Sequence, residues 1–172
     1  MNSRNLVLFA TAVVSTIMVS CGNAQTLQDN TTANTAKNLT YIDWEAQAKT
    51  NIRLLPKYGG RSKTQHQKEA DDRLIDSFIK QYGSRRKGSE ALISTGFEYL
   101  HRKDLKTAMY RFNQAWLLDS LNADVFCGYG AVYSSLNEPA LAMKQYDEGL
   151  RIDPNNPRII KDKANILSGN IK

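Results

Sequence analysis

The sequence predicts an all-α protein: a short α-solenoid of two helix-turn-helix repeats with a capping helix at each end. Three observations predict it. Residues 89–122 match residues 123–156 at an offset of 34, and such a period is typical of stacked helical repeats. Small residues recur inside apolar helical stretches. Residues 69–82 and 157–172 carry the patterns of single helices on either side of the repeats.

The composition is that of an ordinary soluble protein. Of 172 residues, 41% are hydrophobic and 23% are charged, which fits one folded domain with tails. The net charge of +6 comes from 23 Lys and Arg against 17 Asp and Glu. This excess is too small to predict nucleic-acid binding, so no nucleic acid is expected as a partner.

Residues 1–20 are predicted to be a secretory signal peptide. Arg4 gives a positive start, and residues 6–19 form the apolar run LVLFATAVVSTIMV. The run is too short for a comfortable membrane span but suits the core of a signal peptide. The chain is therefore expected to be exported.

The end of this segment has two alternative interpretations as a processing site. Ser20 precedes Cys21 in MVSCGN, which resembles a bacterial lipoprotein box, although Met18 stands where such boxes usually carry leucine. This resemblance implies lipidation of Cys21, and thus a membrane-anchored lipoprotein facing the periplasm. The alternative is ordinary cleavage after Ala24, which predicts a soluble secreted or periplasmic protein. Acylation is favoured because a lone cysteine directly after the apolar run has little other reason to be there.

Residues 21–40 are predicted to be a flexible polar tether, because Asn, Thr, Gln and Ala dominate them and they have almost nothing to bury. Residues 41–88 follow as an N-terminal extension. Its stretch GGRSKT, residues 59–64, lacks the spacing of a phosphate-binding loop and the strand that precedes one. Nucleotide binding is therefore not expected.

The extension is expected to hold two helices. Residues 40–55 predict a short helix capped by Thr40 and stopped by Pro56. Residues 69–82 place apolar side chains four apart, which predicts an amphipathic helix, and Gly83 is expected to end it.

Equivalent residues of the two repeats are of the same kind. The pairs are Gly96 and Gly130, Tyr99 and Tyr133, Ala108 and Ala142, Phe112 and Tyr146, Ala115 and Gly149, Leu118 and Ile152, and Asp119 and Asp153. Glycine or alanine at these places lets two antiparallel helices approach closely, and aromatic side chains fill the gaps. The first repeat is expected to begin near Ser89 as its N-cap.

This order of residues resembles the tetratricopeptide repeat, a helix-turn-helix unit of 34 residues. The resemblance implies one repeat over residues 89–122, a second over 123–156, and a C-terminal capping helix over 157–172, patterned like the first helix of a third. Such repeats do not bury their apolar faces alone, so residues 69–82 are expected to cap the other end.

Tetratricopeptide proteins bind peptides or proteins in a groove lined by the first helix of each unit. The resemblance implies that partner binding uses eleven residues here: Glu90, Ile93, Phe97, Leu100, Asp124, Cys127, Ala131, Ser134, Arg158, Lys161 and Asn165. Lys161 and Asn165 fall where the carboxylate-clamp subfamily has Lys and Asn. A clamp is nevertheless not expected, because Phe97 and Ala131 stand where it needs asparagine.

The groove has an alternative occupant in the chain itself. A short array can use its groove to hold its own N-terminal segment. Tyr41, Ile42 and Trp44 are apolar enough to be that segment. If they are docked there, an external partner must bind elsewhere.

No catalytic site, metal site or cofactor is expected. His66 and His101 have no cysteine or acidic cluster at metal-binding spacing around them. Cys127 lies in VFCGYG, without a histidine or a cation beside it, which predicts a buried, inert thiol. Because no nucleophile, base and orienting group occur together, the protein is expected not to be an enzyme.

The expected function is that of a protein–protein interaction adaptor of the bacterial cell envelope, with another envelope protein or peptide as its partner and Cys21 as its membrane anchor. The alternative is a peptidoglycan-associated or glycan-associated accessory lipoprotein. Exposed aromatic side chains favour that alternative, as does a basic loop with Lys57, Tyr58, Arg61 and Lys63.

Overall fold

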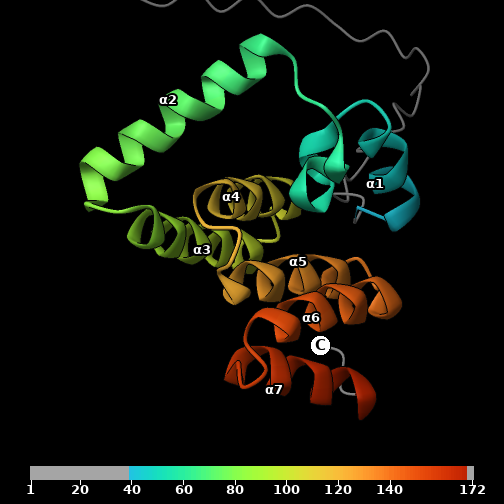
Figure 1. The fold of residues 1–172 in the computed structure, drawn as a ribbon. Helices are drawn as coiled ribbons and strands as arrows, with labels where there is room; N and C mark the ends of the chain where they lie inside the picture. Colours follow the sequence, from blue (N-terminus) through green and yellow to red (C-terminus); the bar gives the residue numbers. More distant parts are fainter. Residues whose placement is uncertain (1–38, 170–172) are drawn as a thin grey trace, which may run out of the picture. The chain divides into compact units, whose positions relative to one another are not determined.

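The computed structural model describes residues 39–169, so the predicted signal peptide, Cys21 and most of the tether lie outside the described part. Within residues 39–169 the chain is entirely helical and holds no strand, which confirms the all-α prediction there (Figure 1). The elements are α1 (Tyr41–Ala48), the 3₁₀ helices η1 (Ile52–Leu54) and η2 (Pro56–Gly60), α2 (Gln65–Tyr82), α3 (Arg85–His101), α4 (Leu105–Leu118), α5 (Ala123–Ser135), α6 (Pro139–Ile152) and α7 (Pro157–Leu167). None of these helices is both long and apolar enough to cross a bilayer.

The first helix is shorter than predicted. Thr40 caps it as expected, with its hydroxyl accepting from the Asp43 backbone N–H at 3.2 Å, but α1 ends at Ala48. Pro56 does not stop a helix; it begins η2, where the missing N–H of proline costs nothing. The backbone then turns left-handed, with φ of 55° at Lys57 and 56° at Tyr58.

Helix α2 begins at Gln65, four residues before the predicted start at residue 69. The reason is a reciprocal capping box: the Gln67 N–H donates to the Thr64 hydroxyl at 3.3 Å, and the Thr64 N–H donates to the Gln67 side chain at 2.9 Å. Its end is as predicted, because Gly83 adopts the left-handed conformation with φ of 82°.

The predicted start of the next helix near Ser89 is wrong. Helix α3 begins at Arg85, with Ser84 as its N-cap accepting from the Lys87 N–H at 3.2 Å. Ser89 lies inside the helix and is fully buried. Its hydroxyl accepts a hydrogen bond from the Asn122 side chain at 3.1 Å, so this serine connects elements instead of capping one.

The hairpins α3–α4 and α5–α6 have the same turn at an offset of 34. Each turn contains one left-handed non-glycine residue, Lys103 with φ of 63° and Asn137 with φ of 60°. In the first turn the Asp104 N–H donates to the Tyr99 carbonyl at 3.0 Å. The equivalent bond of the second turn, from Glu138 to Tyr133, measures 2.9 Å.

The two helices of each hairpin pack closely at glycine. A Cβ atom added to Gly96 would lie 2.5 Å from the Phe112 ring, and one added to Gly130 would lie 2.1 Å from the Tyr146 ring. Side chains cannot approach so closely, so these rings fit only because the glycines have none. Ala108, Ala115 and Ala142 are likewise fully buried, which confirms the predicted role of the small residues.

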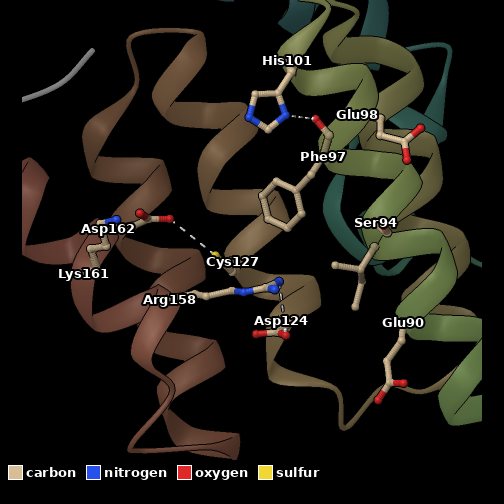
Figure 2. A pocket seen from close by; sticks show the side chains of 11 residues that line it. Glu90, Ser94, Phe97, Glu98, His101, Asp124, Cys127, Arg158, Lys161 and Asp162 are labelled. Atoms are coloured by element: carbon tan, nitrogen blue, oxygen red, sulfur yellow. Dashed lines mark hydrogen bonds and ion pairs between the residues drawn. The ribbon is translucent and has the colours of Figure 1, made fainter.

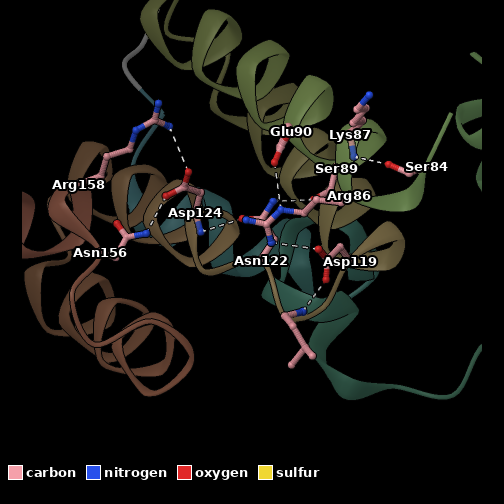
Figure 3. Close-up of polar contacts among 11 residues, drawn as sticks. Ser84, Arg86, Lys87, Ser89, Glu90, Asp119, Asn122, Asp124, Asn156 and Arg158 are labelled. Carbon is pink, nitrogen blue, oxygen red and sulfur yellow. Dashed lines mark hydrogen bonds and ion pairs between the residues drawn. The ribbon is translucent and has the colours of Figure 1, made fainter. Parts of the chain in front are cut away.

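Two asparagines, 34 positions apart, connect successive hairpins (Figure 3). Asn122 accepts from the Asp124 N–H at 3.2 Å and donates to Ser89 on α3. Asn156 accepts from the Ile159 N–H at 3.1 Å and donates to the Asp124 carboxylate at 2.9 Å. Each side chain therefore caps its own helix and fixes it to the first helix of the preceding hairpin.

The 3₁₀ helices η1 and η2 pack against α4, and α1 contacts η1 (Figure 1). Asn113 of α4 is fully buried and donates to the carbonyl groups of Arg53 at 2.8 Å and Leu55 at 3.0 Å. Its carbonyl oxygen accepts from the Tyr129 hydroxyl at 2.8 Å, and that hydroxyl in turn accepts from the Lys57 N–H at 3.3 Å. One buried polar centre thus attaches the N-terminal segment to α4 and α5.

Candidate interaction groove

A pocket of about 700 Å³ lies on the face formed by α3, α5 and α7 (Figure 2). We call it the groove. Its lining consists of Glu90, Ile93, Ser94, Phe97, Glu98, His101, Asp124, Cys127, Arg158, Lys161 and Asp162. These side chains come from the first helix of each hairpin and from α7, so alternate helices contribute to one concave surface.

The groove brings together seven of the eleven residues predicted for partner binding: Glu90, Ile93, Phe97, Asp124, Cys127, Arg158 and Lys161. The other four do not line it, although they lie on the same helices: Leu100, Ala131, Ser134 and Asn165. Three of them lie C-terminal to the last lining residue of their helix: Ala131, Ser134 and Asn165. Leu100 lies on α3 between the lining residues Glu98 and His101. On α5 and α7 the pocket is therefore confined to the N-terminal and central turns, whereas on α3 it extends to the last residue of the helix, His101.

Four lining residues were missed from the sequence: Ser94, Glu98, His101 and Asp162. All four directly follow a predicted residue, and His101 also comes one turn after Phe97. The lining is therefore wider than one residue per helical turn. Helical spacing of i+1 and i+4 around each predicted residue would have found all four.

A cation from α7 reaches across the groove. Figure 2 shows Arg158 extended toward Asp124 of α5, with 3.6 Å between their charged groups. Its guanidinium also lies 6.0 Å from the centre of the Phe97 ring, at the limit of a cation–π contact. The Arg158 side chain remains 59% exposed, so this ion pair contributes little to stability and is open to exchange with a ligand.

Cys127 is buried, as predicted, but its surroundings differ from the sequence expectation. Its thiol donates to the Asp162 carboxylate at 3.5 Å, and Arg158 is a nearby cation supplied by α7. Burial raises the pKa of the Cys127 thiol, and the Asp162 charge raises it further, while Arg158 opposes this shift. The reactive thiolate is thus disfavoured around neutral pH.

We expect Cys127 to react slowly with a thiol reagent in the folded protein. With Cys21 changed to serine, 5,5′-dithiobis(2-nitrobenzoate) at pH 8 should modify folded Cys127 at least tenfold more slowly than the urea-unfolded chain, because the raised pKa and burial remove both thiolate and access. Asp162→Asn removes the adjacent negative charge and should accelerate the reaction. Equal rates for folded and unfolded protein would contradict this description.

The histidines lie in different settings. His101 is exposed at the edge of the groove, and its Nδ1 is 2.7 Å from the Phe97 carbonyl. His66 is exposed too and lies in the first turn of α2. Across residues 39–169 no group of three or more His, Cys, Asp and Glu side chains is placed to hold a metal ion.

The N-terminal segment does not dock in the groove, contrary to the alternative occupant considered above. Trp44 is 1% exposed within the core, and Tyr41 packs edge-on against Tyr133, with 6.4 Å between ring centres. Ile42 points away and is 78% exposed. The groove lining contains no residue from α1, η1 or η2.

The basic loop that favoured glycan binding is engaged internally. Tyr58 is buried beneath the Lys63 ammonium group, which lies 3.4 Å from its ring centre. Lys63 also pairs with Asp71, and Lys57 pairs with Glu148 of α6. The loop therefore lacks the exposed aromatic side chain that a sugar-stacking surface needs.

Comparison with known proteins adds no assignment to these observations. No protein-family model matches the chain, and neither a curated protein nor a solved structure matches it.

Proposed function

We propose that this chain is a non-enzymatic adaptor of the bacterial cell envelope that binds a segment of a partner protein in the groove. The observation that carries the proposal is the pocket itself: seven residues of the tetratricopeptide pattern line one continuous cavity of about 700 Å³. Its lining mixes apolar, acidic and basic side chains, which suits recognition of a peptide with several kinds of side chain.

A tetratricopeptide architecture is part of this proposal. The recurrence of turn geometry at Lys103 and Asn137 supports it, as does the glycine-to-ring packing at Gly96 and Gly130. In this scheme α3–α4 and α5–α6 are the two repeats, α2 and α7 cap the array, and the groove is its concave side.

Attachment to a membrane through Cys21 completes the proposal. The sequence around Cys21 supports acylation, and the polar tether of about nineteen residues would give the helical part a root-mean-square reach of roughly 25 Å. A partner near the membrane would then be met at raised local concentration.

Acylation is tested by growing cells with an alkyne fatty acid and measuring label on the purified chain. The full chain should be labelled and sediment with membranes. Cys21→Ser should lose the label and become soluble after export. Equal labelling of both forms, or none of either, would contradict the anchor without bearing on the groove.

Groove binding is tested by crosslinking in intact cells followed by mass spectrometry. Glu98→Lys combined with Lys161→Glu reverses two exposed charges of the lining, so it should reduce crosslinking of a specific partner at least tenfold. The matched control reverses exposed charges outside the groove, Asp72→Lys with Lys144→Glu. An unchanged partner list in the groove variant would contradict the proposal.

A further inference from the structure

Helix α7 exposes an apolar face that the equivalent helix of the preceding hairpin, α5, buries. Ile160 is 48% exposed and Leu167 is 75% exposed. The residues 34 positions earlier, Phe126 and Tyr133, are only 4% and 6% exposed. Between Ile160 and Leu167 on the same side of the helix lies Ala164, which is also exposed. We call Ile160, Ala164 and Leu167 the α7 face.

The structure shows twice what covers such a face. In the second hairpin, α6 packs on α5 and places the Tyr146 ring against Gly130. In the first hairpin, α4 packs on α3 and places the Phe112 ring against Gly96. In both cases the cover is an antiparallel amphipathic helix with one large side chain over the small central residue.

We infer that the α7 face is a docking site for an amphipathic helix of another protein, packed as α6 packs on α5. None of the three residues of the α7 face lines the groove, although Lys161 borders both surfaces. The site does not depend on the proposed function. The α7 face lies next to the interface between α5 and α6, since α7 contacts both helices (Figure 1). A helix bound to it would extend the same packing by one helix. The partner helix therefore meets a surface with the geometry of the hairpins already formed.

The central side chain of the partner helix is set by Ala164. A Cβ atom at Gly130 would come within 2.1 Å of the Tyr146 ring, so a ring at that depth cannot lie over the Cβ atom that Ala164 carries. A slimmer aliphatic side chain, leucine or methionine, can fill the same place without displacement. We therefore expect an aliphatic side chain of the partner helix opposite Ala164, where α6 places the aromatic ring of Tyr146 opposite Gly130.

Charge favours a partner helix over a second copy of this chain. Lys161 and Lys163 flank the α7 face. Lys163 forms an ion pair with Asp147 of α6, with 2.5 Å between Nζ and Oδ1. Lys161 is exposed and makes no ion pair within residues 39–169. Two such faces meeting would bring like charges together, whereas a helix with acidic residues beside its apolar stripe would complement them.

The test uses a peptide copied from α6, residues 139–152, with Tyr146→Leu, a fluorescent label, and a lactam between Lys144 and Glu148. The lactam is needed because a free peptide of this length is barely helical. Fluorescence anisotropy with the full chain should show saturable binding. Leu167→Asp should weaken it at least tenfold, whereas Leu121→Asp, at a leucine that is 72% exposed elsewhere, should change it less than twofold.

The expected preference for an aliphatic over an aromatic side chain opposite Ala164 gives a second, independent measurement. The peptide with tyrosine kept at position 146 should bind the unchanged chain at least fivefold more weakly than the leucine peptide. Ala164→Gly, which recreates the small residue of α5, should reverse this preference. If the unchanged chain binds the tyrosine peptide more tightly than the leucine peptide, the assignment of an aliphatic side chain opposite Ala164 is wrong.

Three further outcomes would overturn the site. One is the absence of saturable binding. Another is equal weakening by Leu167→Asp and Leu121→Asp. The third is concentration-dependent self-association in sedimentation that Leu167→Asp abolishes, since this would make a second copy the occupant. Each leaves the groove proposal standing, because the peptide and the variants do not alter the groove lining.

Discussion

Asn113→Ala is expected to lower the free energy of unfolding by about 3 kcal/mol, because it removes three hydrogen bonds of a fully buried side chain at once. The Arg53 carbonyl would lose the Asn113 donor, and the Leu55 carbonyl would keep only the Tyr58 N–H. The Tyr129 hydroxyl would keep only the long bond of 3.5 Å to the Phe112 carbonyl as a donor. Buried groups left in this way cost more than the bonds themselves contribute. The melting temperature, followed by circular dichroism, should fall by roughly 10 °C.

Two variants calibrate this loss. Asn51→Ala removes an asparagine from the same segment, whose side chain donates to the Tyr110 hydroxyl at 2.8 Å and accepts from the exposed Arg53 N–H at 3.2 Å. Tyr129→Phe removes only the hydroxyl of the buried centre. Each should cost about 1 kcal/mol. If Asn113→Ala costs no more than Asn51→Ala, the buried centre does not hold the segment in place.

Ala142→Leu is the second variant with a large expected effect, a loss of about 3 kcal/mol. Ala142 is fully buried on α6, in the helix that brings Tyr146 against Gly130. Leucine adds three carbon atoms where no space remains, so it must displace α6 from α5 or adopt a strained rotamer. Urea unfolding should show a lower midpoint with a similar slope.

The matched control is Ala164→Leu, the same change on an exposed helical alanine. It should alter stability by no more than about 0.5 kcal/mol, because the Ala164 side chain is exposed within residues 39–169. Similar losses for the two variants would mean that helix propensity, and not packing, decides the cost at Ala142.

Structural features were predicted correctly from the sequence where a residue type allows a single structural role. Gly83 ends α2 because only glycine adopts its left-handed conformation without strain. The 34-residue offset likewise predicted which small residues would be buried and which rings would face them. These features depend on local geometry repeated along the chain.

Predictions failed where two residues compete for one role. Ser84 and Ser89 are both acceptable N-caps, and the start of α3 at Arg85 depends on the burial of Ser89 beside Asn122. Pro56 was read as a helix stop, although proline also suits the first turn of a new helix. Only the tertiary contacts of each residue distinguish between such readings.

In the groove too, features set by local helical geometry were predicted and features set by tertiary contacts were not. The repeat pattern identified seven residues of the groove and missed four: Ser94, Glu98, His101 and Asp162. The hydrogen bond between Cys127 and Asp162 forms only because α7 packs on α5. Nor does any sequence pattern mark Asn113 as the buried centre, since its partners are main-chain carbonyl groups of a segment about 60 positions earlier.

The attachment of the N-terminal segment has a consequence for the order of folding. Residues 51–57 bond to side chains that follow them by 58 to 72 positions. At a synthesis rate of 5 to 20 residues per second, these residues wait roughly 3 to 14 s for their partners to be made. The part of this domain that leaves the ribosome first therefore reaches its final place late, and throughout that interval its apolar side chains are available to chaperones.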